Sequence, residues 1–255
     1  MIMNKKPNEK QFVLIFPEEI MRLMDDFFET KFKADIEALK QSEKHPAHAI
    51  NDRIRQLTKT NEQREPIGID LPVLIKPEQS EAKATVVLLG QDPLRKSKDI
   101  DEAKVFDNAF IGTPYRAHHL NGLPTNTRVY PKLIQRLLEK GYDVYLTDVR
   151  KYYPSPAKES EKQQAGNADL LIKELGCLKG HFILVLSGQQ SQHFYNLYKD
   201  KLDAVKSDYV ICLPHLSGVG GMKKWKELAG CATHEAKIKY VMEKITSIDC
   251  KTKQK

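Results

Sequence analysis

From residue 84 onward, short runs of apolar residues alternate with stretches in which apolar residues recur three and four positions apart. Near-continuous apolar runs are typical of strands in a parallel sheet that is covered on both faces, and the longer spacing predicts helices. Gly141 marks the end of the first helix. The predicted strands are Ala84–Leu89, Val144–Thr147, Phe182–Leu186 and Tyr209–Leu213, and the predicted helices are Pro131–Lys140, Ala168–Leu175, Gln190–Tyr198 and 231–247.

This alternation predicts a three-layer α/β/α fold around a four-stranded parallel sheet. The N-terminal part shows a helical pattern without such strands. Within residues 11–60, apolar positions such as Ile20, Met24 and Phe28 recur at helical spacing. Pro17 suits the first turn of a helix. Residues 61–82 are less regular. We predict one domain over residues 1–255, with a mainly helical N-terminal elaboration (1–82), a sheet core (83–247) and a basic tail (248–255).

The formal net charge of +7 and the pI of about 9.0 suit a polyanionic partner, because cationic side chains that neutralise phosphates release counterions. We therefore expect DNA as the partner. No apolar run approaches the roughly 20 residues that cross a membrane, and the N-terminus lacks the apolar core of a signal peptide. We expect a cytoplasmic monomer that does not bind membranes.

The cysteines and histidines give no indication of a metal site or a cofactor. Cys177, Cys212, Cys231 and Cys250 lack the paired spacing of zinc and iron–sulfur sites, and the eight histidines show no ligand spacing. Cys212 lies inside an apolar run, so we expect it to pack as a small hydrophobic residue. The sequence predicts reduced thiols, no metal and no cofactor.

Polar residues follow each of the four predicted strands. The carboxyl ends of parallel strands meet at one edge of the sheet, where ligands bind in open α/β folds. The segments predicted to converge there are Gly90-Gln91-Asp92-Pro93, Thr147-Asp148-Val149-Arg150, Ser187-Gly188-Gln189-Gln190 and Pro214-His215-Leu216-Ser217-Gly218, together with the aromatic-bearing loop Asn108–Tyr115. Taken alone, Asp92 is equally compatible with a helix cap.

Five of these segments, in order over roughly residues 84–225, resemble motifs of the uracil-DNA glycosylase superfamily. Gly90-Gln91-Asp92-Pro93 is similar to the water-activating loop, and Phe110 to the aromatic that stacks on the extruded base. Tyr145-Leu146-Thr147-Asp148 resembles the strand that ends in the base-reading residue. Leu186–Gln189 resembles the phosphate-binding loop, and Leu213–Ser217 resembles the segment that opens the DNA-intercalating loop.

The resemblance implies a set of roles. Asp92 would position water and stabilise the cationic sugar, while His215 would stabilise the departing base, which must first be flipped out of the stack. Base contacts are implied for Gln91, Leu94, Phe110 and Asp148. DNA contacts are implied or expected for Gly188, Gln189, Ser217, Val219, Met222, Lys223 and Lys224. The last four of these belong to a segment that we expect to form a flexible loop with an apolar tip. We expect Trp225, at the end of this loop, to anchor the next helix.

Three departures from the family pattern bear on the substrate. Leu94 stands where a tyrosine usually blocks C5 of the base. Asp148 stands where an asparagine usually reads uracil. A carboxylate accepts a hydrogen bond from the cytosine N4 amino group but repels O4 of uracil. The alternative is that Asp148 only caps the following segment. Leu213 stands at the usual histidine position, so His215 either replaces that histidine from two residues further on or contacts phosphate.

Together these departures favour a 5-substituted cytosine of the kind found in some phage DNA, and therefore an anti-phage DNA glycosylase. We expect a monofunctional hydrolase that leaves an abasic site, although Lys96, Lys98 or Lys151 could act as a Schiff-base nucleophile. The alternatives are a uracil-DNA glycosylase of base-excision repair and a non-catalytic DNA-binding module. A nucleotide hydrolase is disfavoured because neither a Walker-type loop nor clustered aspartates occur.

Overall fold

A six-stranded mixed sheet forms the centre of the computed structural model, which describes residues 12–58, 66–77, 82–93, 108–120, 129–154, 160–180, 182–203, 207–217 and 221–252. The strand order is β1-β4-β7-β5-β9-β10. Four neighbouring strands are parallel, and β4 and β1 extend the sheet in the antiparallel sense. The bounds are β1 Phe12–Ile15, β4 Val73–Pro77, β7 Asp143–Asp148, β5 Thr85–Gly90, β9 Phe182–Ser187 and β10 Ser207–Leu213.

The predicted four-stranded parallel sheet is therefore only part of the real one. Its four strands were located within two residues at each end, but β1 and β4 were missed. Both lie in the segment that was predicted to be mainly helical or irregular. They have four and five residues, too few to give a clear alternating pattern.

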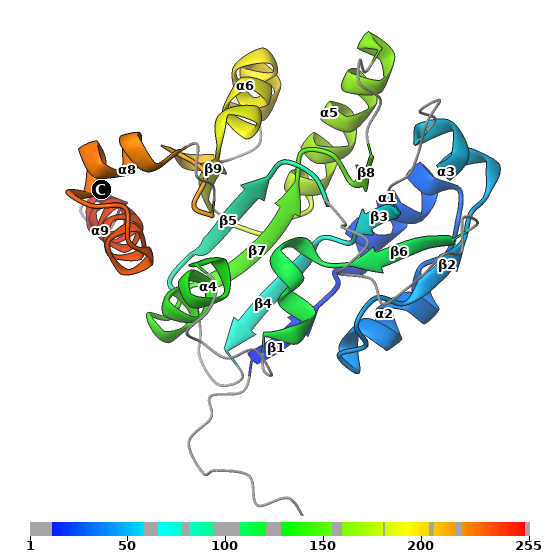
Figure 1. The fold of residues 1–255 in the computed structure, drawn as a ribbon, viewed down its shortest axis with the longest axis horizontal. Helices are drawn as coiled ribbons and strands as arrows, with labels where there is room; N and C mark the ends of the chain where they lie inside the picture. Colours follow the sequence, from blue (N-terminus) through cyan, green and yellow to red (C-terminus); the bar gives the residue numbers. More distant parts are fainter. Residues whose placement is uncertain are drawn as a thin grey trace, which may run out of the picture.

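The sheet is covered on both faces, because successive side chains of a strand point to opposite sides. In β5, Val87 and Leu89 join one hydrophobic cluster, while Val86 and Leu88 join the other. The first cluster includes residues of α1 (Glu18–Phe28), α5 (Glu161–Gly176) and α6 (Gln189–Leu197); the second includes residues of α4 (Val129–Glu139), α8 (Met222–Ala229) and α9 (His234–Thr252). The predicted α/β/α layering is present (Figure 1).

The N-terminal elaboration contains strands as well as the predicted helices. It supplies two strands of a second, four-stranded sheet of order β2-β6-β3-β8, which lies with the N-terminal helices at one end of the larger sheet (Figure 1). The bounds are β2 Ala47–Ala49, β6 Asn108–Gly112, β3 Ile67–Asp70 and β8 Tyr152–Tyr153, and the helices here are α2 Lys33–Lys40 and α3 Asp52–Leu57. Strands β3 and β6 are parallel, so Asp70 lies opposite Gly112.

Helix boundaries depart from the predictions for identifiable reasons. Helix α5 begins at Glu161, seven residues before the predicted start, because Ser160 and Gln163 form a capping box ahead of a polar first half. Helix α9 reaches Thr252 and so includes part of the predicted basic tail. Two short elements, α7 (Lys199–Asp203) and the 3-10 helix η2 (Pro114–His119), were not predicted. Within the described ranges no helix is both long and apolar enough to cross a bilayer.

Cys212 is exposed, so the prediction that it packs as a small hydrophobic residue is wrong. It lies on β10, which is the last strand of the sheet and has a neighbour on one side only. Apolar flanking residues cannot distinguish such an edge position from a central one. The three cysteines whose side chains are described, Cys177, Cys212 and Cys231, are free thiols.

A buried ion pair fixes the carboxyl end of β7. Lys151 and Glu174 are each about 1 % exposed, and their charged groups lie 2.8 Å apart. The Lys151 ammonium also donates to the hydroxyl of Thr147 and to the backbone carbonyl of Asp148. The Tyr145 hydroxyl donates to the other oxygen of Glu174 over 2.7 Å. This network joins β7 to helix α5 beneath the strand end.

We expect Lys151→Met to lower the free energy of unfolding by about 3–5 kcal/mol, because it leaves the Glu174 carboxylate buried without its partner. Urea denaturation followed by circular dichroism measures this change. The matched control is Lys201→Met at the exposed pair with Asp169, whose groups lie 3.3 Å apart and whose loss costs less than about 1 kcal/mol. Equal losses in the two variants would show that the buried pair does not fix the strand end.

Candidate active site

Asp148 lies across the carboxyl end of β5. The parallel register pairs it with Gly90, and its side chain is buried. A Cβ atom on Gly90 would collide with Oδ1 of Asp148, so only glycine leaves room for the carboxylate at this place. The structure therefore puts Asp148 at the predicted strand end, with its carboxylate directed over the neighbouring strand.

Asp92 lies on the turn beyond Gly90, and its side chain is 11 % exposed. The Gln91 side-chain amide donates to Asp92 Oδ2 over 2.9 Å, and the guanidinium of Arg150 lies 3.9 Å from the same oxygen. The backbone N–H groups of Val149 and Arg150 donate to the carbonyls of Gly90 and Gln91. The segments that follow β5 and β7 are thus tied together, which limits the movement of both carboxylates.

Phe110 is buried on β6, yet it belongs to neither of the two hydrophobic clusters. Its neighbours Ala109 and Ile111 are part of the first cluster, so the ring of Phe110 lies on the other side of the strand. This separation from the core suits an aromatic ring that serves a ligand. Leu94, Lys96, Lys98 and Val219, to which the sequence also assigned or offered roles, lie outside the described residues.

Tyr115 ends the loop that was predicted to converge here, but the sequence analysis gave it no role. Its ring stacks on Tyr130 with centroids 3.9 Å apart, and its hydroxyl would lie 2.8 Å from a Cβ on Gly90, next to the Asp148 carboxylate. The hydroxyl is buried and has no hydrogen-bond partner among the described residues. Burial raises its pKa well above the ordinary value, and the nearby Tyr130, Asp148 and Asp70 raise it further.

Helix α6 begins directly after the third strand end. Gly188 has a φ of +94°, and its own N–H donates to the Leu213 carbonyl over 2.9 Å. That bond occupies the Gly188 N–H, but the N–H groups at the start of α6 have no partner within the helix and point outward, as in phosphate sites. Gln189, at the start of α6, is exposed. Ser187 is buried, and its hydroxyl lies 2.5 Å from that of Tyr130.

His215 follows the fourth strand end and packs against Gly188, where a Cβ would lie 3.3 Å from the imidazole. The Ser217 hydroxyl lies 3.2 Å from Nδ1, and the ring of Tyr130 contacts the imidazole edge-on at 5.7 Å. Partial burial lowers the pKa of His215, and the positive charge of Lys237 lowers it further, which favours the neutral form of the ring.

Two buried side chains hold the His215 segment from below. Trp225 donates from Nε1 to the His215 carbonyl over 3.2 Å, and Lys237 donates to the Leu216 carbonyl over 2.8 Å. Trp225 is fully buried, as expected for an anchor. The predicted flexible loop is wrong for residues 222–225, because Met222, Lys223 and Lys224 form the exposed first turn of α8.

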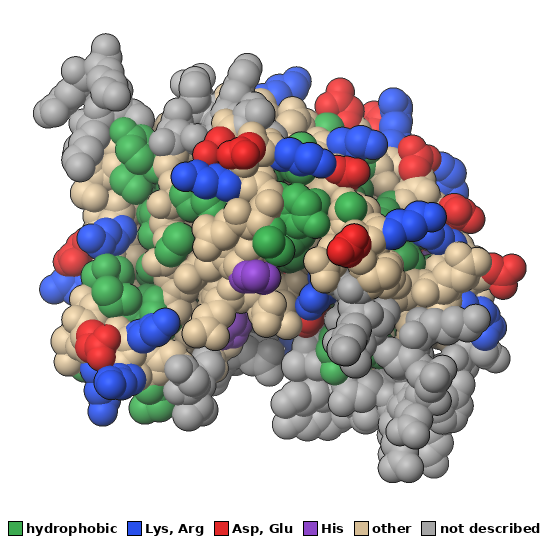
Figure 2. All heavy atoms as spheres, turned by 90° about the horizontal axis from the view of Figure 1, so that it is seen from above, with side chains coloured by type: hydrophobic (Ala, Val, Ile, Leu, Met, Phe, Trp, Pro, Cys, Tyr) green, Lys and Arg blue, Asp and Glu red, His purple; other side chains and the backbone are tan. Residues whose placement is uncertain are grey.

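Three of the four strand ends share one hollow. A cavity of about 560 Å³ is lined by Gln91, Gly188 and His215, and by Lys224 of α8. Figure 2 shows the side of the molecule toward which β5 and β7 run, and basic and acidic side chains are interspersed over its described part. DNA contact at this face would therefore depend on local groups such as Lys224 and the start of α6.

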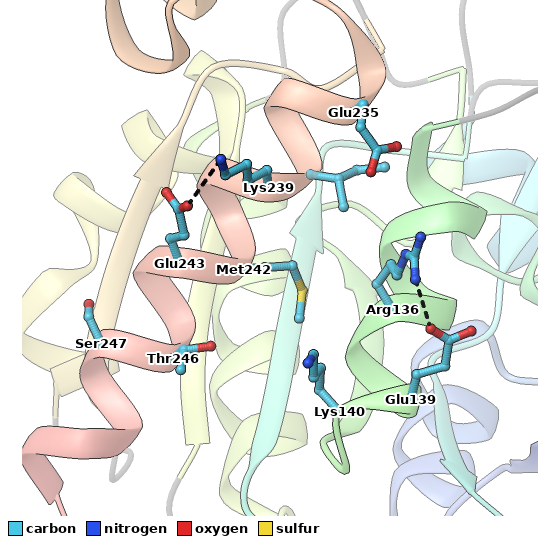
Figure 3. A pocket seen from close by; sticks show the side chains of 10 residues that line it. Arg136, Glu139, Lys140, Glu235, Lys239, Met242, Glu243, Thr246 and Ser247 are labelled. Carbon is cyan, nitrogen blue, oxygen red and sulfur yellow. Dashed lines mark hydrogen bonds and ion pairs between the residues drawn. The ribbon is translucent and has the colours of Figure 1, made fainter.

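A second hollow of about 580 Å³ lies between α4 and α9, on the outside of the second cluster (Figure 3). Four of its charged side chains form two pairs, Arg136–Glu139 at 3.3 Å and Lys239–Glu243 at 3.9 Å. It contains none of the residues that were assigned to the site. We therefore place the candidate site at the strand ends.

Lys151 cannot serve as a Schiff-base nucleophile in this structure, because its ammonium is buried in the pair with Glu174. Groups of three or more metal-binding side chains do not occur within the described ranges. Sequence reasoning brought Asp92, Asp148, Gly188 and His215 to one edge of the sheet. It missed the stack of Tyr115 on Tyr130 and the contacts that Arg150, Trp225 and Lys237 make with the site segments, because these contacts depend on tertiary packing.

A family model, the uracil DNA glycosylase superfamily, matches residues 77–236. No curated protein and no solved structure matched the chain. The matched region includes Asp92, Phe110, Asp148, Gly188 and His215. The chain belongs to the uracil DNA glycosylase superfamily.

Proposed function

We propose that this protein is a monofunctional DNA glycosylase that hydrolyses the N-glycosidic bond of a flipped, 5-substituted cytosine, and that it acts in defence against phages with modified DNA. Membership of the superfamily makes the chain a DNA glycosylase in general terms, a hydrolase of N-glycosyl bonds that acts on DNA. The observation that carries the narrower proposal is the buried carboxylate of Asp148, held over Gly90 at the predicted base-reading position.

Breaking an N-glycosidic bond builds positive charge on the sugar and negative charge on the leaving base. A fixed carboxylate beside the sugar stabilises the cation and orients the attacking water. Asp92 suits this role because the Gln91 amide and the Arg150 guanidinium hold it while part of its surface stays exposed. The Arg150 charge is too distant, at 3.9 Å, for a tight pair that would neutralise the carboxylate.

The leaving pyrimidine carries its negative charge mainly on O2 and N1. A neutral imidazole can donate a hydrogen bond to O2 without transferring a full proton. The lowered pKa of His215 supports this state at pH 7, and Trp225 and Lys237 hold the backbone carbonyls of His215 and of the next residue. We assign His215 to the leaving base and Ser217, 3.2 Å from its Nδ1, to orienting the ring.

The base-reading carboxylate favours cytosine. Asp148 can accept from the N4 amino group, whereas uracil presents O4 at that edge and would face a second acceptor. Phe110 would stack on the flipped ring. Leu94, in place of a blocking tyrosine, and Gln91 would leave room at C5 for a substituent. The start of α6 at Gly188 and Gln189 would bind a flanking phosphate, as would Lys223 and Lys224, while Met222 and Val219 would enter the base stack.

The burial of Lys151 supports hydrolysis without strand cleavage. A bifunctional glycosylase needs a free amine as nucleophile. Lys151, the described member of the three candidate lysines, is held in the buried pair with Glu174. We therefore propose water as the nucleophile and an intact abasic site as the product.

We expect Asp92→Asn to slow base release from duplex DNA by about 10²–10⁴-fold, because the amide cannot stabilise the cationic sugar or accept a proton from water. Quenched-flow or gel assays of abasic-site formation measure the rate, and a mobility-shift assay checks that DNA binding persists. Asp169→Asn, on the exposed surface of α5, is the matched control. Release by Asp92→Asn at the normal rate would show that Asp92 is not the catalytic carboxylate.

We expect the wild-type protein to release 5-hydroxymethylcytosine or its glucosylated form faster than uracil from otherwise identical duplexes. Asp148→Asn should shift the ratio of the two rates toward uracil by about 10–100-fold, since one bidentate base contact is worth roughly 1–3 kcal/mol. Mass spectrometry of the released bases measures both rates. Preferential release of plain uracil by the wild type would instead support a repair enzyme, and DNA binding without release of any base would support a non-catalytic module.

A further inference from the structure

The backbone at Tyr115 is unusual for residues with side chains. Tyr115 and Arg116 have φ values of 58° and 60°, in the left-handed region that favours glycine. Such conformations persist only where the surroundings enforce them, and they are concentrated at functional sites. Here the enforcing contact is the stack on Tyr130, whose own hydroxyl is fixed by Ser187 at 2.5 Å. The local strain thus holds one phenol in a defined place.

No hydrogen bond among the described residues accounts for the hydroxyl at the end of that phenol. It is buried and lacks a hydrogen-bond partner among the described residues, which costs stability that phenylalanine would not lose. The stack on Tyr130 needs only the ring. Burial and the neighbouring Tyr130, Asp148 and Asp70 all raise the pKa of Tyr115, so the oxygen keeps its proton and remains a donor. A buried donor without an acceptor indicates a ligand that supplies one.

Tyr115 and Asp148 converge over the same glycine. A Cβ on Gly90 would collide with the Asp148 carboxylate and would lie 2.8 Å from the Tyr115 oxygen, so a donor and an acceptor stand side by side. Cytosine presents the complementary pair at adjacent positions, an acceptor at N3 and a donor at the N4 amino group. Uracil presents the reverse pair, N3–H and O4. A carboxylate has two oxygens, so Asp148 can keep a contact to the protein and still accept from N4.

We propose that the hydroxyl of Tyr115 and the carboxylate of Asp148 form one donor–acceptor pair that reads N3 and N4 of the flipped cytosine. This inference rests on the proposed function and specifies how its base is recognised. Asp148 alone would leave N3 of cytosine without a donor. Tyr115 supplies that donor, and cytosine then needs no proton of its own to enter the site.

The test combines a protein change with a substrate change. Tyr115→Phe removes the hydroxyl and keeps the stack, and a 3-deaza analogue of the preferred 5-substituted cytosine replaces the N3 acceptor by C–H. We expect Tyr115→Phe to slow release of the natural base by about 10–100-fold, in line with the loss of a base-reading contact. With the 3-deaza base, wild type and Tyr115→Phe should react at the same rate within about threefold, because the contact is already absent.

Stability gives an independent readout. If the hydroxyl is kept for the ligand, its removal should leave the melting temperature of the free protein unchanged or raise it by about 2–4 °C. Tyr195→Phe is the control, because the partly buried hydroxyl of Tyr195 has a partner, Asp203, at 2.5 Å. That variant should melt at a lower temperature and retain normal base release. A structural role for Tyr115 would produce the opposite result, with lower stability and unchanged selectivity.

The outcomes separate this inference from the proposed function. If the wild type releases 5-substituted cytosine but Tyr115→Phe does so equally fast, the donor role of Tyr115 is wrong and the proposed function stands. If Tyr115→Phe is slower by the same factor on the natural and the 3-deaza base, the hydroxyl acts elsewhere and the inference again fails. If the wild type releases only uracil, the proposed function and the inference both fail.

Discussion

The buried pair of Lys151 and Glu174 is the constraint on which the site depends. The Lys151 ammonium donates to the carbonyl of Asp148 and the hydroxyl of Thr147 and pairs with Glu174, so it ties the end of β7 to α5. The backbone carbonyl of Lys151 also accepts from the N–H of Asp70, which joins the smaller sheet to the same point. One residue therefore positions the Asp148 carboxylate, the larger sheet and the sheet that carries Phe110. A charge buried this deeply is tolerated only because its partner and two acceptors surround it.

From this fixed point, the site divides into a rigid part and a DNA-facing part. Asp92 and Asp148 lie on adjacent strand ends joined by two backbone hydrogen bonds. The stack of Tyr115 on Tyr130 connects them to Ser187 on the third strand end, and Tyr130 contacts His215 on the fourth. The side chains expected to contact the DNA backbone are exposed on the first turns of α6 and α8 instead. In the proposed function, the chemistry and the choice of base therefore depend on the sheet, and contact with the DNA backbone depends on the ends of helices.

The sequence was sufficient for the parallel strands and for most of the residues at their ends. Continuous apolar runs identify buried strands, and parallel topology then brings Asp92, Asp148, Gly188 and His215 together. It was not sufficient for β1 and β4, which are short, or for Cys212, whose exposure follows from an edge position. Nothing in the sequence separates Tyr115 from the other tyrosines, because its proposed role depends on a left-handed backbone and a stack across the fold. The glycines near Met222 suggested a loop, whereas burial of Trp225 stabilises a helix there.

The most direct test of the account is a crystal structure of the Asp92→Asn protein with a duplex that contains one 5-hydroxymethylcytosine. The account predicts that the base is flipped out of the stack, with its N4 amino group within about 2.7–3.2 Å of the Asp148 carboxylate. A flipped cytosine whose N4 is bound by other groups, with Asp148 directed away from it, would contradict the account.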